Sequence, residues 1–345
     1  MTSHAAVANQ DLVIPLIDFS NFINGGPLER QSTAQEILHG FQTAGFIYLK
    51  NHPIPAHVLQ RIFIRSATFF ALDDETKLRL QWTTPEANRG YSSPGREKAS
   101  QLVDVSEVSK IRTQAPDLKE SLEIGRDTRP EFPNQWPDEG DNVSLRGFRK
   151  DMVDFFRTCQ ALHVDVMRAI ALGMGLEQDF FDQFINASDN NLRLLHYPGV
   201  KAKVFKLNPG QTRAGEHSVS AEAIEVPGLW LHHAALSGQP GRFQVKSPTG
   251  DFVDATPIEG TIVVNAGDLL ARWSNDTIRS TIHRVVEPPS QDDEHPARYS
   301  IAYFCNANLD SFIETLPGTY ATEQDKKYKG VKSWEYLVQR LRTTY

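Results

Sequence analysis

Apolar positions in the first part of the chain alternate between strand-like runs and helical spacing. Val13 to Phe19 and Phe46 to Lys50 are short, β-rich runs that predict two strands, the second of them buried. Between them, the spacing predicts a helix from Glu29 to Thr43, with Gly45 as its C-cap. A further helix is expected to carry the apolar side chains from Val58 to Phe70.

The most regular helical pattern of the chain begins at Phe148. Apolar residues recur at steps of three and four as far as Ile170, which predicts one long helix of about seven turns that ends near Gly173 or Gly175. We interpret its Phe and Met stripe as a core-facing seam. Before this helix, residues 82 to 145 are rich in Pro, Gly, Asp and Arg and predict loops with short strands.

Beyond Asp189 the pattern changes to short β runs that are separated by turns. These runs cover residues 192–197, 243–247, 261–265, 280–286 and 299–305. Short strands at this spacing predict a sandwich or barrel, and the double-sheet jelly roll is the version that encloses a site. The expected fold class is mainly β with flanking α: a double-stranded β-helix (jelly-roll) barrel with a long supporting helix and a helical N-terminal region. A last helix is expected around residues 334–341.

Composition places the chain among ordinary globular proteins. Its 345 residues are 40% hydrophobic and 23% charged, and the net charge of −7 offers no basic face to a nucleic acid. A small-molecule partner is therefore expected, without nucleic acid or membrane, while the sequence leaves the oligomeric state open. Met1 to Gln10 lack the order of a secretion signal, so we expect a frayed N-terminus on a cytoplasmic protein. Cys159 and Cys305 are predicted to be buried thiols.

Several polar residues in the β-rich part carry candidate chemistry. His283 lies in an alternating segment and shares a face with Thr281, and His217 follows a turn-like stretch. Each histidine alone is also compatible with a satisfied core residue. Arg298 and Ser300, two positions apart on a predicted strand, present a guanidinium and a hydroxyl on one face, where they can bind a carboxylate.

Taken in order, these residues and the runs 264–268 and 273–276 resemble the 2-oxoglutarate-dependent dioxygenases related to isopenicillin N synthase. The N-terminal runs 14–18, 45–52, 89–91 and 119–121 resemble that family's N-terminal region. Within the family, runs 190–198 and 300–306 are most similar to the thymine dioxygenases, which oxidise the methyl group of thymine. The resemblance implies four segments: a dioxygenase N-terminal region (12–125), the long helix (146–176), the jelly-roll domain (188–306) and a C-terminal segment with a helix (307–345).

The resemblance also implies site residues and cofactors. His217 and His283 would be the imidazole ligands of Fe(II), and Tyr197, Arg298 and Ser300 would hold the distal carboxylate of 2-oxoglutarate. With O2, and with ascorbate as a candidate reductant, the cosubstrate would leave as succinate and CO2 while the substrate is hydroxylated.

The expected substrate is a small, planar, nitrogen-containing ring such as thymine. Asn190 and Arg193 can donate to the polar edge of a pyrimidine, with Phe304 against its ring. A turn asparagine and an ion-paired arginine are equally compatible interpretations of the first two residues.

The pattern breaks directly after His217. The family has His-x-Asp, whereas this chain has Val219, and valine cannot ligate iron. Nearby acidic and histidine residues, namely Glu216, Glu222, His232 and His233, are more readily interpreted as solvated side chains. The halogenase branch of the family also lacks the carboxylate, but it has a small Gly or Ala there.

We interpret residues 219–242 as an unspliced, frame-shifted stretch. Codons for Gly228 to Gly241, read one base later, can spell Asp-Tyr-Gly-Ser-Ile-Thr-Leu-Leu-Phe-Gln-Asp-Asn-Pro, the family's continuation after His-Ser. Three hypotheses follow: a hydroxylase of a thymine-like pyrimidine, a catalytically dead small-molecule binding protein on the same scaffold, and a related dioxygenase that acts on another secondary metabolite.

Overall fold

Two β-sheets that face each other form the centre of the molecule. The computed structural model describes residues 4–96, 117–140, 142–207, 214–217, 222–226, 242–286 and 293–344. Within these ranges the large sheet has the strand order β1-β2-β3-β12-β9-β15-β6-β5-β4 and the small sheet the order β11-β10-β13-β8. The large sheet comprises β1 (His4–Asn9), β2 (Leu12–Asp18), β3 (Phe46–Lys50), β4 (Gly90–Ser92), β5 (Glu120–Gly125), β6 (Asn191–Tyr197), β9 (Glu222–Val226), β12 (Thr261–Asn265) and β15 (Arg298–Cys305). The small sheet comprises β8 (Ala214–His217), β10 (Arg242–Lys246), β11 (Phe252–Asp254) and β13 (His283–Val286).

Strict alternation along the central strands gives the large sheet two apolar faces. On β15, Ile301 and Tyr303 belong to the outer core, whereas Ala302 and Phe304 belong to a second core between the sheets. On β3, Leu49 and Tyr48 divide in the same way. A strand that is buried on both faces must be apolar on both parities, which explains its near-continuous hydrophobic sequence. The outcome is the predicted jelly-roll architecture, with β8, β10, β11 and β13 facing the inner side.

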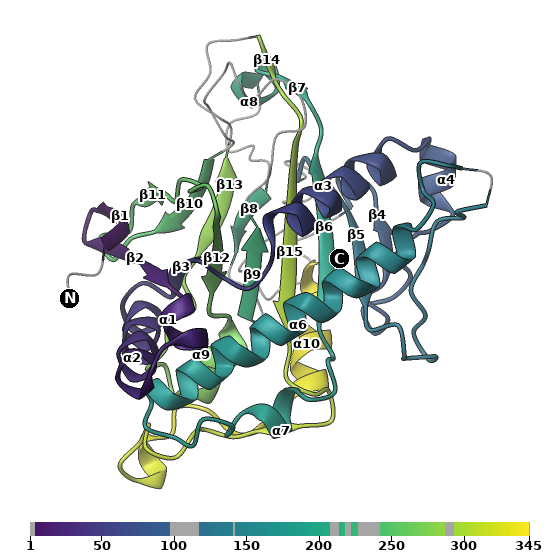
Figure 1. Cartoon of the computed structure of the whole chain (residues 1–345). Coiled ribbons are helices and arrows are strands. Elements are labelled where there is room, and N and C mark those ends of the chain that lie inside the picture. The colour runs from purple at the N-terminus through teal and green to yellow at the C-terminus, as the bar shows by residue number, and fades with distance from the viewer. Residues whose placement is uncertain are drawn as a thin grey trace.

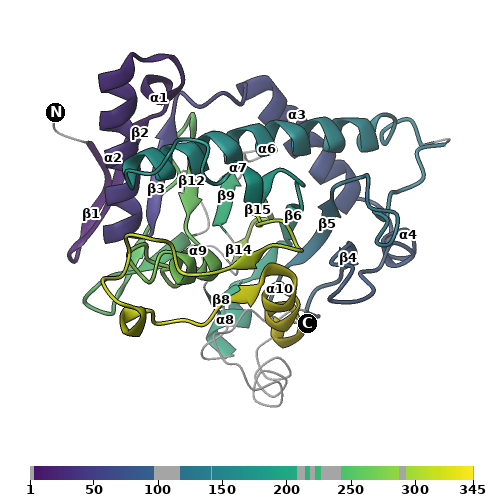
Figure 2. The ribbon, with the colours of Figure 1, turned by 90° about the horizontal axis from the view of Figure 1, so that it is seen from below.

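Helices cover the outer face of the large sheet. The long helix α6 (Phe148–Gly173) crosses this face diagonally, with α3 (Ala56–Phe70) and α2 (Pro27–Thr43) on the same side (Figures 1 and 2). Its apolar stripe, with Phe155, Cys159 and Val166 among its members, is buried in the outer core, as predicted. No helix in the described ranges is long and apolar enough to cross a membrane.

Gly45 ends helix α2 and opens β3, as its predicted role as a C-cap requires. Its amide donates to the carbonyl oxygen of Gly40 over 3.1 Å, and its φ is +71°. A Cβ at this position would lie 2.5 Å from the carbonyl oxygen of Arg279. Glycine is therefore required both for the left-handed backbone and for the close approach of the segment before β13.

The smaller elements complete the chain. They are α1 (Ser20–Asn24), α4 (Asp74–Leu78), α7 (Asp182–Ile185), α8 (Lys203–Leu207), α9 (Asp268–Trp273), η1 (Glu323–Asp325) and α10 (Ser333–Thr344), with the paired short strands β7 (Val200–Lys201) and β14 (Glu294–His295), and β16 (Phe312–Ile313) and β17 (Val331–Lys332). The last predicted helix is thus confirmed as α10. The two cysteines are buried free thiols, also as predicted.

Two expectations were wrong. The segment expected to be frayed is ordered from residue 4 on, because residues 4–9 form β1, an antiparallel partner of β2. Gln10 and Asp11 both have positive φ, which is the backbone of a two-residue hairpin turn, although neither residue is glycine. The strand expected from residue 280 begins at His283, because the segment before it is held to α2: the hydroxyl of Thr281 donates to the carbonyl oxygen of Ala44 over 2.8 Å.

Candidate functional site

His283 lies on the inner side of β13, between the two sheets. It is 4% exposed, and the rings of Phe46 and Phe243 lie 5.5 and 5.4 Å from its own, between centroids. Its Nδ1 is 3.1 Å from the carbonyl oxygen of Thr281. Because a carbonyl only accepts, Nδ1 carries the proton in this contact. This is the arrangement in which metal-ligating histidines are usually held.

The backbone places His217 beside His283. The antiparallel register of β8 and β13 makes the two residues direct partners, so both histidines predicted from the sequence lie on one rung of the small sheet. Val219 and residues 227–241 lie outside the described residues. Among the side chains that the structure describes, no three His, Cys, Asp or Glu residues come together as metal ligands.

Arg298, Ser300 and Tyr197 come together on the inner face of the large sheet. Arg298 and Tyr197 are direct partners in the register of β15 and β6. All three are buried, with exposures of 5%, 0% and 3%, and the guanidinium carbon lies 5.2 Å from the centre of the tyrosine ring. Among the described residues, nothing accepts a hydrogen bond from Nη1 of Arg298. A buried guanidinium nitrogen in this state can donate to an anion.

Arg193 and Phe304 form a second group farther along the same face. The guanidinium carbon of Arg193 lies 5.0 Å from the centre of the Phe304 ring. Its Nε is 2.6 Å from Oε1 of Glu123 on β5, and the glutamate side chain is fully buried. The interpretation of Arg193 as ion-paired is thus correct, and this pair fixes the guanidinium against the aromatic ring.

The structure does not bring Asn190 into this group. Its amide nitrogen donates to the hydroxyl of Tyr303 over 3.0 Å and to Gln160 of α6, and its carbonyl oxygen accepts from the backbone N–H of Asn306 over 2.7 Å. These partners lie on the outer side of the sheet, and both the nitrogen and the oxygen of the amide form hydrogen bonds there. Asn190 is an odd number of positions from Arg193 and Tyr197, so alternation assigns it to the opposite face.

Asn191 lies on the face of the sheet where Asn190 was expected. It is 2% exposed and lies opposite Phe304 in the register, and its amide nitrogen donates to the carbonyl oxygen of Asn88 over 3.0 Å. No donor within the described part of the chain reaches its Oδ1. Strand parity would have selected Asn191 over Asn190, because it is two positions from Arg193.

Arg89 is a second residue that the sequence analysis did not assign to the site. Its side chain is buried, and burial lowers its pKa to about 10. The guanidinium lies against the backbone of Gly125, the residue opposite Asn191 on β5, and occupies the space that a Cβ would take there. In the ranges that the structure describes, nothing accepts a hydrogen bond from its Nε. Arg89 therefore adds a buried donor at this end of the sheet.

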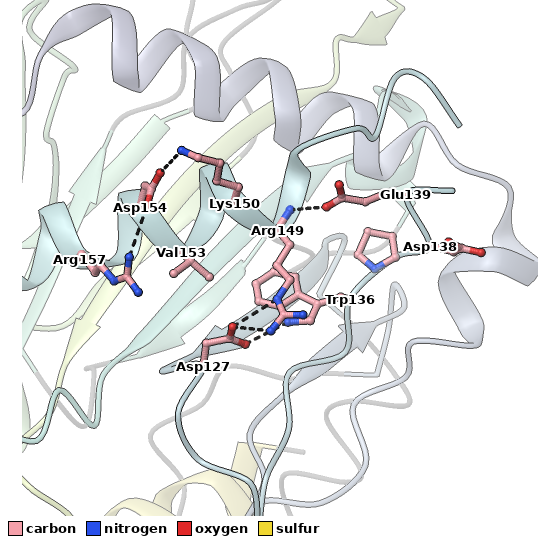
Figure 3. A pocket seen from close by; sticks show the side chains of 10 residues that line it. Asp127, Trp136, Asp138, Glu139, Arg149, Lys150, Val153, Asp154 and Arg157 are labelled. Carbon is pink, nitrogen blue, oxygen red and sulfur yellow. Dashed lines mark hydrogen bonds and ion pairs between the residues drawn. The ribbon is translucent and has the colours of Figure 1, made fainter. Parts of the chain in front are cut away.

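A groove elsewhere on the molecule is not part of this arrangement. It measures about 690 Å³ and lies along the first half of α6 (Figure 3). Its charged side chains pair with one another: Arg149 with Asp127 over 2.7 Å, and Lys150 with Asp154 over 2.6 Å. These pairs are exposed and satisfied, so they do not require a ligand.

Two family models match the chain. The N-terminal region of non-haem dioxygenases in morphine synthesis matches residues 14–139, and the 2OG-Fe(II) oxygenase superfamily matches residues 231–307. Among curated relatives, the 2-oxoglutarate-Fe(II) type oxidoreductase ppzD of Metarhizium rileyi is 32% identical over 95% of this chain and 90% of its own length. Proline hydroxylase buaE of Petromyces alliaceus is also 32% identical, over 95% and 98%.

Solved structures give a more similar relative. The full-length thymine-7-hydroxylase of Neurospora crassa, in complex with alpha-KG and thymine, is 59% identical, with a TM-score of 0.88 over 99% of this chain and 100% of that one. A 2OG-Fe(II) oxygenase family protein of Caulobacter crescentus is 28% identical, with a TM-score of 0.75 over 95% and 98%. The chain belongs to the 2-oxoglutarate- and Fe(II)-dependent oxygenases.

Proposed function

We propose that this chain is a hydroxylase that binds 2-oxoglutarate through Arg298 and oxidises the methyl group of thymine or of a closely similar pyrimidine. The observation that carries the proposal is the inner face of β6 and β15. At one end lies a buried guanidinium whose Nη1 has no acceptor among the described residues, and at the other lies an arginine–phenylalanine pair. The similarity to the Neurospora thymine-7-hydroxylase, which was solved with alpha-KG and thymine, supports the same assignment.

The residues present suit the cosubstrate. The distal carboxylate of 2-oxoglutarate would accept from Nη1 of Arg298 and from the hydroxyls of Ser300 and Tyr197. A charge-assisted, buried contact of this kind discriminates strongly against oxo-acids that lack the second carboxylate. The tyrosine ring next to the guanidinium also keeps water from the charge.

The second group suits a pyrimidine that carries two carbonyl oxygens and a ring N–H. Phe304 offers a flat apolar surface for the ring, and Arg193 offers donors that Glu123 holds in place. Asn191 offers an acceptor, Oδ1, for the ring N–H. A ligand without these groups would leave buried polar atoms of the protein without hydrogen-bond partners, and this cost gives the larger share of the specificity.

The iron site is the part where the chain departs from its family. Iron, when bound, supplies the activation of O2 that this chemistry needs. The backbone brings His217 and His283 together, but Val219 replaces the carboxylate, so the residues present do not fit the complete three-ligand set. We attribute this to the frame-shifted stretch 219–242, and sequencing of the transcript tests it. A message that encodes Val-Ser-Ala-Glu after His217-Ser218 would contradict the attribution.

A second candidate follows from the same residue. If the printed chain is the one made, its carboxylate and pyrimidine subsites are intact while its metal site is not, so it would bind small molecules without turning them over. A third candidate, oxidation of another secondary metabolite, is favoured by the varied names of the relatives near 30% identity, such as proline hydroxylase.

Two versions of the protein separate these functions. One is the printed chain; in the other, residues 219–241 are replaced by the shifted-frame sequence that begins Asp-Tyr. Anaerobic addition of Fe(II) and 2-oxoglutarate should give a weak visible absorption in the restored version alone. That version should release succinate faster with thymine than with uracil or proline. Equal release with all three would refute the pyrimidine assignment, and absorption in both versions would refute the role given to the missing aspartate.

A further inference from the structure

A row of polar and aromatic side chains crosses the outer face of the sheet directly behind the carboxylate subsite. Glu120 on β5, His196 on β6 and Tyr299 on β15 are successive partners in the strand register. Nδ1 of His196 lies 2.6 Å from Oε1 of Glu120. The imidazole stacks on the ring of Tyr299, with centroids 4.7 Å apart and planes inclined by 13°.

Glu120 ties this row to the N-terminal region. Its Oε2 accepts from Nζ of Lys77 over 3.1 Å and from the hydroxyl of Tyr91. Burial raises the pKa of the Glu120 carboxyl, but the hydrogen bonds from His196, Tyr91 and Lys77 outweigh it and hold the pKa below its ordinary value. A buried carboxylate with donors from three elements is a fixed point of the structure.

The place of the row in the register gives it a role beyond stability. Tyr299 lies between Arg298 and Ser300, and His196 precedes Tyr197, so each residue of the carboxylate subsite is next in sequence to a member of the row. Side chains alternate across the sheet, which puts the row outside and the subsite inside. Arg298 is moreover the first residue of β15. Tyr299, the next residue, makes an outer contact through its stack on His196.

We propose that Glu120, His196 and Tyr299 are positioning residues that fix the end of β15 and thereby aim Arg298 and Ser300 at the distal carboxylate of 2-oxoglutarate. The inference rests on the proposed function, because it assumes that Arg298 holds this carboxylate. If the row only attached the N-terminal region to the barrel, substitutions in it would lower stability without changing the preference between oxo-acids. If the row positions the guanidinium of Arg298, the same substitutions would also change that preference.

The test compares two oxo-acids by calorimetric titration, with Mn(II) in place of iron and again without metal. 2-Oxobutyrate lacks the distal carboxylate of 2-oxoglutarate. The dissociation constant of 2-oxobutyrate divided by that of 2-oxoglutarate therefore measures that contact alone. Tyr299→Leu should lower the ratio about five- to tenfold, since small displacements of a binding group weaken an aligned contact strongly. His196→Phe keeps a ring for the stack but loses the bond to Glu120, and should lower the ratio about two- to threefold.

Tyr303→Leu is the matched control. It removes a buried tyrosine from the same face of the same strand, at the end far from Arg298. It should lower the melting temperature while leaving the ratio unchanged. If Tyr299→Leu and Tyr303→Leu give equal ratios, the positioning role is wrong. Arg298→Gln tests the proposed function separately from the positioning role. If its ratio equals that of the unmodified chain, Arg298 does not hold the distal carboxylate, and both the proposed function and the inference are wrong.

Discussion

The buried pair of Glu123 and Arg193 gives the sharpest stability prediction. The two atoms in contact, Oε1 and Nε, are 2.6 Å apart, and the side chains are 0% and 12% exposed. Glu123→Gln leaves a buried guanidinium without its charge partner. Breaking one side of such a pair costs about 3 to 5 kcal/mol, and we expect the lower end because glutamine still offers an oxygen.

The same reasoning fixes the double variant. Arg193→Gln alone leaves the buried carboxylate without its charge partner and should lower the free energy of unfolding by a similar amount. Glu123→Gln combined with Arg193→Gln leaves two neutral amides that can form a hydrogen bond with each other. The loss of unfolding free energy in the double variant should therefore be smaller than the sum of the two single losses by about 2 kcal/mol or more.

Equilibrium unfolding in urea, followed by far-UV circular dichroism, measures these free energies. The slope of the unfolding free energy with urea should stay constant, because the compactness of neither state is changed. The control is Asp182→Asn, which breaks an ion pair with Arg168 whose side chains are 31% and 36% exposed. It should cost less than about 1 kcal/mol. Additive losses at Glu123 and Arg193, or a loss there as small as in the control, would refute the reasoning.

Two further predictions concern parts of the fold away from the site. Burial lowers the pKa of His163 in α6 to about 3 from an ordinary value of 6.5, so between these pH values the unfolded chain binds more protons than the folded one. Stability should therefore fall as the pH falls below 6.5, by about 2 kcal/mol at pH 5, and chemical unfolding of His163→Gln across pH should lack this component. Gly45→Ala should cost about 2 to 4 kcal/mol because both its φ and the nearby carbonyl of Arg279 oppose a side chain. Gly250→Ala, with positive φ but nothing within 4 Å, should cost only about 1 kcal/mol, and thermal unfolding compares the two.

Hydrophobic periodicity was sufficient to predict most of the large elements. The stripe from Phe148 to Ile170 could only be satisfied by a long amphipathic helix, and the capping glycine at Gly45 marked the junction of α2 and β3. The hairpin of β1 and β2 was not predictable in the same way, because Gln10 and Asp11 adopt a turn that usually contains glycine or asparagine. There, pairing with β2 overrides local preference.

The site was predictable to the extent that it follows from strand parity. Arg298 and Ser300 share a parity and share a face, as expected. Asn190 was expected on the same strand as Tyr197 and on the same face, but its amide bonds to Tyr303 on the outer side, and Asn191 is the residue that shares the parity of Arg193. Arg89 could not have been placed by any local pattern, because it comes from a loop and reaches the sheet only through the space that Gly125 leaves open.

The arrangement of the strands separates what this chain binds from what it can oxidise. Both proposed ligand subsites lie on β5, β6 and β15, where β6 pairs with the other two strands, and α3 and α6 pack behind them. The expected metal ligands lie on β8 and β13 of the other sheet, and β8 is the strand that leads directly to Val219. A change at Val219 therefore disturbs the metal site, whereas β9, the large-sheet strand that follows it, pairs with β15 at residues 301–305, beyond Arg298 and Ser300. The printed chain should consequently keep its preference for 2-oxoglutarate over 2-oxobutyrate even where it forms no product, and a chain that has lost both would show that the two sheets do not act independently.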